Sequence, residues 1–275
     1  MTKLHDPRAG QKEAQMRFWG EGFDVPVNVP DWAALKRHVS ERLQVGEGFS
    51  LATINLDHLV KLRCDGRFRD AYAAQDLVVA DGNPIVWLSR LAGRPVDLIP
   101  GSDAILPLAQ LVAAHGKTLG LVGSTQQTLT AARQYLEREV PGTRVVATLA
   151  PPMGFEPAGA AADDVLDALG HSGADVVLLA LGAPKQELFA AYGRQRLPTV
   201  GFVSIGAGLD FLSGAQKRAP GWVRAIAMEW AWRALSQPAR MIPRYAKCVT
   251  ILPLEVTHAI RLRRAGNASG LVPDR

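Results

Sequence analysis

The chain has 275 residues, of which 48% are hydrophobic and 21% charged, and this balance excludes general disorder, a coiled coil and a collagen-like fibre. The net charge of +5 is uneven, because residues 215–264 contain ten Lys or Arg against two acids while the rest of the chain sums to −3. A basic end on a near-neutral body favours an anionic partner, such as a membrane surface, a phosphorylated ligand or nucleic acid, over a merely solvated basic face.

Two further features bear on location. The apolar runs fall far short of the roughly 20 residues that cross a bilayer, and the N-terminus lacks the apolar stretch of a secretory signal. The two cysteines, Cys64 and Cys248, form neither a disulfide framework nor a metal-binding pair. We therefore expect a cytoplasmic protein.

The predicted elements begin with a lead-in segment, residues 1–45, that contains a short helical pattern at Trp32–Leu43. Short apolar runs then alternate with segments at helical spacing. The predicted strands are Ser50–Asn55, Leu77–Ala80, Thr118–Val122, Arg144–Thr148, Val176–Leu181 and Thr199–Ile205, and the clearest helices are Asp103–His115, Thr125–Val140, Ala161–Leu169 and Pro184–Arg194. This alternation is typical of a doubly wound α/β fold with a mostly parallel, Rossmann-like sheet, here over residues 46–214.

After Gly214 the pattern predicts helices only, one over Trp222–Ala234 and another over Pro238–Arg264 that Pro243 and Pro253 interrupt. Residues 215–264 are thus expected to form a basic appendage that associates with membranes, residues 265–275 a disordered tail, and the chain up to Gly214 a unit that folds alone. An apolar stripe on the first helix favours a membrane interface, although packing on the sheet domain is the alternative; its members are Val223, Ile226, Ala227, Trp230 and Ala234.

Polar residues and glycines follow the predicted strands, where ligands of open α/β sheets bind. They include Thr53, Asn55, Asp81, Gly123, Lys185, Gln186, Gly206 and Asp210. Glycine lets a backbone approach a ligand closely, and the helix starts that follow favour a phosphate. A phosphorylated or nucleotide-linked ligand is expected, although each site alone also fits an ordinary turn.

Several common motifs are absent. The sequence has no P-loop, no G-x-G-x-x-G, no G-x-S-x-G, no Asp-x-Asp and no metal-ligand spacing among its six histidines. P-loop phosphoryl transfer, a dehydrogenase and a plain serine hydrolase are disfavoured, and no metal site is visible.

The order of motifs resembles the WecG/TagA/CpsF family of bacterial glycosyltransferases over about residues 50–250. The motifs are Thr53-x-Asn55, Ala80-Asp81-Gly82, the run Leu181 to Glu187, the run Ile205 to Asp210, Lys217-Arg218-Ala219-Pro220, Glu229-Trp230-x-Trp232-Arg233 and Pro238-x-Arg240-x-x-x-Arg244. The resemblance implies inverting transfer of N-acetylmannosamine, its uronic acid or glucose from a UDP donor. The implied acceptor is a polyprenyl-diphosphate-linked sugar at the inner face of the cytoplasmic membrane, in cell-envelope or exopolysaccharide synthesis.

The resemblance also implies residue roles. Asp81 matches the general base and Thr53 its neighbour, while Asn55 and Gln186 match polar pocket residues. Arginines of a C-terminal appendage that closes over the site match Arg233, Arg240 and Arg244.

The residues themselves also allow structural alternatives. Asp81 could cap the helix that starts near Pro84, Lys185 and Glu187 could form a surface pair, and Gln186 could be an exposed helix residue.

The chemistry agrees with the implied roles. One carboxylate must take the proton of the attacking hydroxyl. Without a visible metal site, the leaving diphosphate needs positive charge from Arg, Lys or helix N-termini, and Arg233 and Arg240 would supply it. No cofactor beyond the UDP-sugar is expected.

Two rival functions remain at this point, another nucleotide-dependent Rossmann-like enzyme and a non-enzymatic protein that binds lipid-linked glycan. Nucleic acid is not expected, because tryptophans interleave the basic segment at helical spacing, and homo-oligomerisation stays open.

Overall fold

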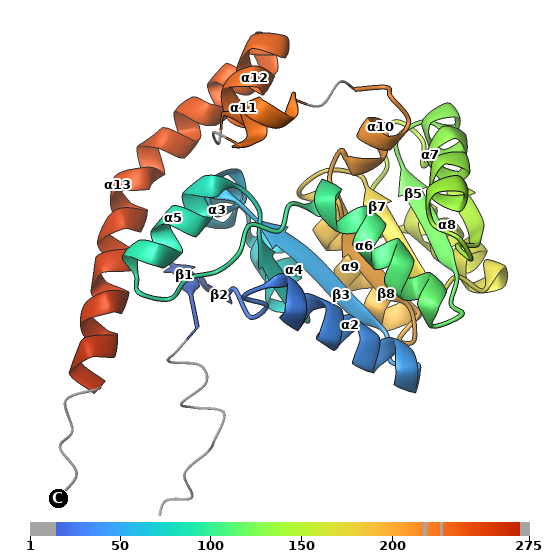
Figure 1. Cartoon of the computed structure of the whole chain (residues 1–275), viewed down its shortest axis with the longest axis horizontal. Coiled ribbons are helices and arrows are strands. Elements are labelled where there is room, and N and C mark those ends of the chain that lie inside the picture. Colours follow the sequence, from blue (N-terminus) through green and yellow to red (C-terminus); the bar gives the residue numbers. More distant parts are fainter. Residues whose placement is uncertain (1–14, 217–218, 226–227, 270–275) are drawn as a thin grey trace, which may run out of the picture.

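The computed structural model describes residues 15–216, 219–225 and 228–269 (Figure 1). Six strands form one parallel sheet in the order β4-β3-β8-β7-β5-β6. They are β3 (Phe49–Ile54), β4 (Leu77–Ala80), β5 (Leu119–Gly123), β6 (Val145–Leu149), β7 (Val176–Ala180) and β8 (Gly201–Ser204). The predicted doubly wound α/β fold is confirmed, and each predicted strand lies within two residues of its observed bounds.

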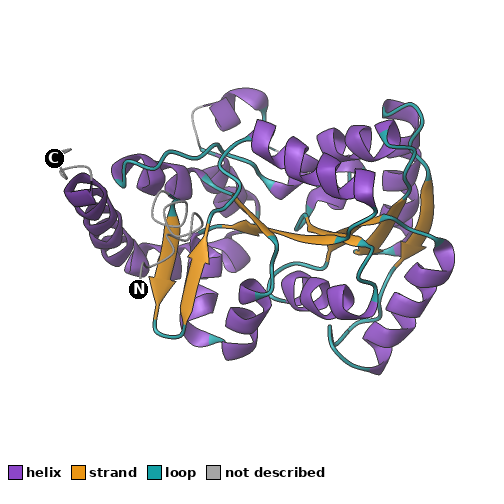
Figure 2. Cartoon of the chain, turned by 90° about the horizontal axis from the view of Figure 1, so that it is seen from below, coloured by secondary structure: helices purple, strands orange, loops and turns teal. Residues whose placement is uncertain are grey.

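Helices cover both faces of the sheet, as the edge-on view of Figure 2 shows. On one face α2 (Trp32–Val45), α6 (Gly101–Ala114), α7 (Gln126–Glu139) and α10 (Gly208–Leu212) pack on a continuous apolar core. On the other lie α3 (Leu56–Cys64), α4 (Gly66–Ala73), α5 (Asn83–Leu91), α8 (Ala160–Ser172) and α9 (Lys185–Arg196). Successive strand residues point to opposite faces, so Leu51 and Ala52 of β3 belong to different clusters. Burial on both sides explains why these strands read as continuous apolar runs.

A β-hairpin precedes the sheet domain, in the segment where the sequence predicted no strand. Its strands β1 (Arg17–Gly20) and β2 (Phe23–Pro26) pair antiparallel, with Gly22 at a φ of 75° in the turn. Phe18, Phe23 and Val25 are buried in the same cluster as α3, α4 and α5. The lead-in segment therefore belongs to the core of the domain.

The C-terminal region differs from the prediction in its first part. The predicted helix Trp222–Ala234 is wrong as one element, because the structure has two short helices, α11 (Gly221–Ala225) and α12 (Glu229–Ser236). Residues 226 and 227 of the expected stripe lie outside the described residues. Met228 N–H donates to the Val223 carbonyl of α11 at 2.9 Å, and α12 begins only at the next residue. The stripe thus does not run along a single helix.

The second part is a single long helix, α13 (Pro238–Ser269), which continues through Pro243 and Pro253. The predicted interruptions are wrong. Each proline removes one backbone donor, but both are exposed, so water can satisfy the freed carbonyl, and the buried face of the helix lies elsewhere. The helix also includes residues 265–269, which were expected to be disordered; residues 270–275 lie outside the described residues.

α13 is docked on the sheet domain along α3 and α5, as Figure 1 shows. Its buried residues Met241, Cys248, Glu255 and Leu262 recur every seventh position and so fall on one face. Glu255 forms an ion pair with Arg63 of α3, and the Trp19 ring of β1 stacks on His258 with ring centroids 4.3 Å apart. The N- and C-terminal regions therefore meet on the same side of the domain.

Candidate active site

Asn55 and Asp81 meet at the carboxyl ends of β3 and β4. Strand pairing continues past Ile54, whose carbonyl accepts the Asp81 N–H at 2.8 Å. The Asn55 side chain caps α3 by accepting the His58 N–H at 3.1 Å, and its Nδ2 donates to Asp81 Oδ2 at 3.2 Å. Gly82, at a φ of 102°, lets the chain turn sharply into α5 after Asp81. The two predicted residues are thus brought together, and Gly82 rather than Asp81 occupies the cap position of α5.

Thr53 lies one layer below this pair, with 4% of its surface exposed. Its carbonyl accepts hydrogen bonds from the Tyr72 hydroxyl at 2.6 Å and from His58 Nδ1 at 2.8 Å. Because a carbonyl only accepts, the proton of the His58 ring is on Nδ1. Burial, aided by the Lys61 charge, lowers the pKa of His58 to about 3, so the ring is neutral. His58 and Tyr72 therefore act as a scaffold that fixes the end of β3.

Gln186 and Glu187, at the start of α9, are buried in the protein. Gln186 Oε1 accepts the Gly206 N–H at 3.0 Å, and its Nε2 donates to Glu187 Oε1 at 2.7 Å. Gln186 is 2% exposed and Glu187 0%, which excludes both an exposed Gln186 and a surface pair of Lys185 with Glu187. Burial raises the pKa of Glu187 to about 7. The Gly206 amide, expected to face a ligand, is occupied by Gln186 in this structure.

Gly123 and Asp210 shape the part of the edge formed by β5 and β8. A Cβ on Gly123, whose φ is 114°, would lie 2.4 Å from the Ala180 carbonyl oxygen, so only glycine fits. The next residue, Ser124, donates from Oγ to Asp210 Oδ1 at 2.7 Å, while Gln216 donates to Asp210 Oδ2 at 2.9 Å. Both oxygens of Asp210 thus hold protein segments together at the edge of the sheet.

Several helices begin at this edge without a side-chain cap. The starts of α5, α6 and α9 have no side-chain cap hydrogen bond, whereas Asn55 caps α3 and Thr125 caps α7. Gly101, at the start of α6, is packed so closely on the end of β8 that a Cβ would lie 2.9 Å from Ile205 Cα. Uncapped helix N-termini carry free N–H groups and a positive partial charge, which favour a phosphate.

The predicted arginines occupy different settings. Arg244 of α13 pairs with Asp57 of α3, Nη2 to Oδ2, at 3.0 Å, and Lys61 contacts the same carboxylate. Burial alone would raise the pKa of Asp57, but the charges of Arg244 and Lys61 lower it overall. Arg240 is exposed on the first turn of α13, and the side chain of Arg233 lies outside the described residues. The structure therefore assigns Arg244 a contact that ties α13 to α3 beside Asn55.

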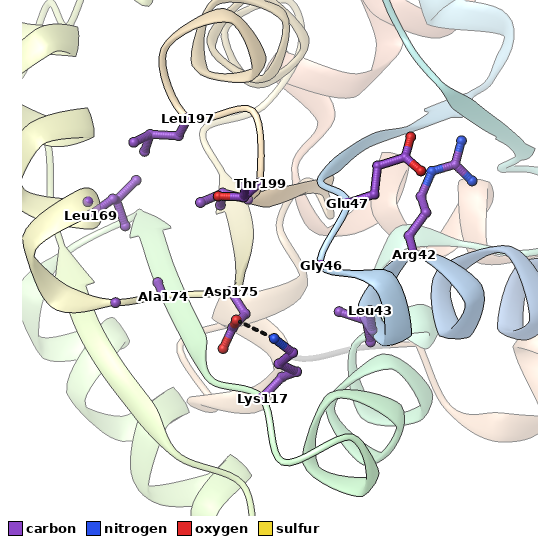
Figure 3. Close-up of a pocket in the computed structure, with 13 residues that line it drawn as sticks. Arg42, Leu43, Gly46, Glu47, Lys117, Leu169, Ala174, Asp175, Leu197 and Thr199 are labelled. Atoms are coloured by element: carbon purple, nitrogen blue, oxygen red, sulfur yellow. Dashed lines mark hydrogen bonds and ion pairs between the residues drawn. The ribbon is translucent and has the colours of Figure 1, made fainter.

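A separate hollow of about 280 Å³ lies at the opposite edge of the sheet (Figure 3). Lys117 and Asp175, 3.2 Å apart, line it together with Arg42, Glu47 and Thr199. The helices α2, α6, α8 and α9 end near this hollow, so their negative C-terminal dipoles point toward it. This edge suits an anionic diphosphate less well than the carboxyl edge.

Sequence reasoning missed several residues that support the carboxyl edge from beneath or beside it. Asp57 and Lys61 are four apart on α3, which is a helix-pair signal, and Asn55 with His58 has the spacing of an N-cap. Nothing in the local sequence, in contrast, shows that Glu187 turns inward. Within the described part of the chain, no group of three or more His, Cys, Asp or Glu side chains is arranged to hold a metal ion.

Comparisons with known proteins identify the family of this chain. The model of the glycosyl transferase WecG/TagA/CpsF family matches residues 21–266. One relative, from Bacillus spizizenii, is 27% identical over 215 residues, which cover 75% of this chain and 80% of that protein. Another, from Bacillus subtilis, is 26% identical over 222 residues, or 78% of this chain and 82% of that protein. Both are named N-acetylglucosaminyldiphosphoundecaprenol N-acetyl-beta-D-mannosaminyltransferase. The chain therefore belongs to the WecG/TagA/CpsF family of glycosyl transferases.

Proposed function

We propose that the protein transfers a hexose with inversion from a UDP donor to a polyprenyl-diphosphate-linked glycan. The observation that carries the proposal is the Asp81 carboxylate, held by Asn55 at the edge where the uncapped N-termini of α5, α6 and α9 gather. The names of the two Bacillus relatives support an acceptor of this class and a sugar of the N-acetylmannosamine type. Its uronic acid and glucose are the other candidate donor sugars.

The proposed reaction is a single displacement at the anomeric carbon. The acceptor hydroxyl oxygen forms the new bond, the bond to UDP breaks on the opposite face, and the hydroxyl proton passes to the Asp81 carboxylate. Asn55 orients that carboxylate through its 3.2 Å hydrogen bond, and Thr53 holds the strand end beneath. Asp81 is the catalytic residue in this scheme.

The leaving diphosphate gains negative charge and needs positive groups to stabilise it. The N-termini of α5, α6 and α9, with the positive ends of their helix dipoles, and the half-buried Lys185 lie at the edge where we place it. Arg233 and Arg240 are proposed to reach the diphosphate from α12 and α13. Gly123, Gly206 and Asp210 shape the nucleotide side of the site, and Arg244 acts by docking α13 on α3.

The proposed location is the inner surface of the cytoplasmic membrane. Among the described residues, no helix is both long and apolar enough to span a bilayer. The C-terminal region exposes many apolar side chains, namely Trp222, Met228, Trp230, Leu235, Ile242, Val249, Leu254 and Ile260. Exposed Arg240 and Lys247 lie among them, and each basic residue near an anionic leaflet adds roughly 1 kcal/mol of attraction. This combination favours reversible peripheral binding.

The proposal is tested by incubating the protein with single UDP-sugars and a short-chain lipid-diphosphate acceptor, with products identified by mass. We expect one UDP-sugar to yield one added hexose, and Asp81→Asn to lower the transfer rate by a factor on the order of 10² or more. The matched control is Asp70→Asn, an exposed aspartate on α4, which should transfer at the wild-type rate.

Two results would contradict the proposal. Unchanged transfer by Asp81→Asn would assign Asp81 a structural role. No transfer with any UDP-sugar, combined with thermal stabilisation by NAD or S-adenosylmethionine and none by UDP, would favour another nucleotide-dependent enzyme.

A further inference from the structure

Glu187 is an unusual residue in the structure, a fully buried carboxylate directly beneath the proposed donor site. Its side chain is 0% exposed, and among the described residues its Oε2 has no hydrogen-bond partner. Burying a carboxylate without full hydrogen bonding is costly, so such a group calls for a role that offsets the cost. No part of the proposed displacement uses Glu187.

The contact between Glu187 and Gln186 is also uncommon. Neighbouring residues on a helix point about 100° apart and rarely meet, yet Gln186 Nε2 donates to Glu187 Oε1 at 2.7 Å. The Gln186 side chain therefore folds back along the first turn of α9. This geometry requires an acceptor at position 187.

Two partners, the Gly206 N–H and the carboxyl group of Glu187, together fix the orientation of the Gln186 amide. A backbone N–H can only donate, so the Gly206 N–H selects Oε1 of Gln186, and Nε2 must then point toward Glu187. Without an acceptor at position 187, Nε2 of Gln186 would have no hydrogen-bond partner in a buried site. The amide would then no longer be held with Oε1 toward the Gly206 N–H. The three groups thus form a chain of two hydrogen bonds that links α9 to the turn after β8.

The turn after β8 carries groups of the proposed donor site. Gly206 has a φ of 58°, and the chain then enters α10, where Asp210 binds Ser124 at the end of β5. Any shift of the Gly206 turn would therefore move the contact between Asp210 of α10 and Ser124 after β5.

We propose that Glu187 is a positioning residue, which orients the Gln186 amide and so fixes the Gly206 turn against which the donor nucleotide binds. This inference rests on the proposed function for the identity of the nucleotide. The hydrogen-bond chain itself involves only protein groups.

The charges around Glu187 are consistent with a carboxyl group that changes its protonation near neutral pH. Lys61 and Asp57 of α3 act on its charge, and burial, followed by the negative charges of Glu187 and Asp81, raises the pKa of the Tyr72 hydroxyl in turn. Burial dominates and raises the pKa of Glu187 to about 7, whereas Lys61 lowers it and Asp57 raises it. The folded protein thus keeps a proton on Glu187 that the unfolded chain loses above about pH 4.5. Stability from this proton is full below that pH and declines as the pH rises to about 7.

The test compares Glu187→Ala with Glu187→Gln, which retains an acceptor oxygen and a similar shape. Glu187→Ala is expected to raise the Kd of UDP and the KM of the UDP-sugar about tenfold, with kcat within about threefold, because a displaced turn weakens binding in both the ground and transition states. Glu187→Gln is expected to restore both constants to within about twofold. A merely structural role would lower Tm without this split between KM and kcat.

Gln186→Met provides an independent route, because it removes the same two hydrogen bonds and leaves the carboxylate in place. If the proposal holds, the effects of Gln186→Met and Glu187→Ala on the Kd of UDP are not additive in the double variant. Additive effects would overturn it. Should Glu187→Ala fail to fold, Gln186→Met and Glu187→Gln carry the test.

Amide hydrogen exchange at Gly206 separates this inference from the proposed function. Gln186→Met and Glu187→Ala should both speed exchange of the Gly206 N–H, and Glu187→Gln should not, whether or not UDP binds. The control Asp175→Asn, at the opposite edge of the sheet, should lower Tm without changing Gly206 exchange or the Kd of UDP. Unchanged Gly206 exchange in Glu187→Ala would overturn the inference. Normal exchange behaviour with no binding of UDP would overturn the proposed function alone.

Discussion

α12 and α13 belong to the same basic segment, yet they relate to the rest of the protein in different ways. α13 buries one face on α3 and α5, with an ion pair between Glu255 and Arg63. α12 packs on α13, where Trp230 meets Tyr245 edge to face, and its Leu235 is 83% exposed. The docked helix is thus part of the core, and the other lies on its surface.

The difference shows that apolar residues at helical spacing do not by themselves distinguish a docked helix from a surface helix. Both helices carry apolar residues at helical spacing, whereas only α13 is basic, because α12 contains one acid, Glu229, and one base, Arg233. What separates them is the seven-residue recurrence of buried positions on α13, which extends over several turns and includes the carboxylate of Glu255. A long helix can bury such a face continuously, whereas α12, of eight residues, is too short to do so.

The largest expected effect comes from deleting α13, in comparison with replacing α11 and α12. Deletion of residues 238–269 exposes the face of the domain that Ala259 and Leu262 cover, so we expect loss of cooperative thermal unfolding. The sequence alone predicted that the chain up to Gly214 folds by itself, whereas the docking of α13 leads us to expect that the domain needs this helix to fold. Replacing residues 221–236 with a short Gly-Ser linker should leave a cooperative transition, measured by calorimetry. Similar melting of the two deletion variants would contradict the distinction.

A smaller effect is expected from single carboxylates on the two helices. Glu255→Ala leaves Arg63 without its buried partner and should lower the free energy of unfolding by about 2–4 kcal/mol. The matched change on α12 is Glu229→Ala, which removes a half-exposed carboxylate and should cost less than about 1 kcal/mol. Urea unfolding of both variants measures the difference, and equal losses would show that α12 is docked as firmly as α13.

The pH dependence of α13 docking sharpens the comparison further. The charges of Arg244 and Lys61 outweigh burial and lower the pKa of Asp57, so the stability from this contact is full above about pH 4 and is lost as the pH falls through the lower folded value. Asp57→Asn should therefore reduce stability by about 1 kcal/mol at pH 7, and the difference from wild type should shrink below pH 4. Thermal melts from pH 3 to 7 measure it. A difference that grows with acid would contradict the assignment.

The smallest effect on stability is expected at Trp230, which is 52% exposed. Trp230→Ser should change the free energy of unfolding by less than about 1 kcal/mol while weakening binding to anionic vesicles, because an interfacial tryptophan is lost. Met153→Ser, at a fully exposed residue after β6, is the control and should bind as wild type. Vesicle co-sedimentation at two salt concentrations measures both. Equal vesicle binding by Trp230→Ser and wild type would show that Trp230 of α12 does not contribute to membrane binding.

The sheet could be predicted from the sequence because strands buried on both faces appear as apolar runs, and the helices between them keep their periodicity. The hairpin could not, since β1 and β2 have four residues each and include Gly20 and Pro26, which resemble loop residues. Pro243 and Pro253 suggested breaks in α13, but tertiary docking keeps the helix continuous.

The site was predictable in part for a related reason. Parallel strands place their carboxyl ends at one edge, and Asn55 and Asp81, each expected to follow a strand, are joined there by a hydrogen bond. The inward turn of Gln186 and the pairing of Arg244 with Asp57 depend on partners far away in sequence. Such directions are fixed by tertiary packing, which local patterns do not encode.

The double hydrogen bonding of Asp210 has a consequence for exchanging C-terminal segments between relatives. Asp210 holds Ser124 with one oxygen and Gln216 with the other, so the connection toward α11 begins as part of the rim of the sheet. A chimaera joined just after Gly214 would replace Gln216 and leave one Asp210 oxygen without its partner. A junction placed after Gln216 would keep both hydrogen bonds of Asp210. The boundary for such an exchange therefore lies after Gln216 rather than at Gly214.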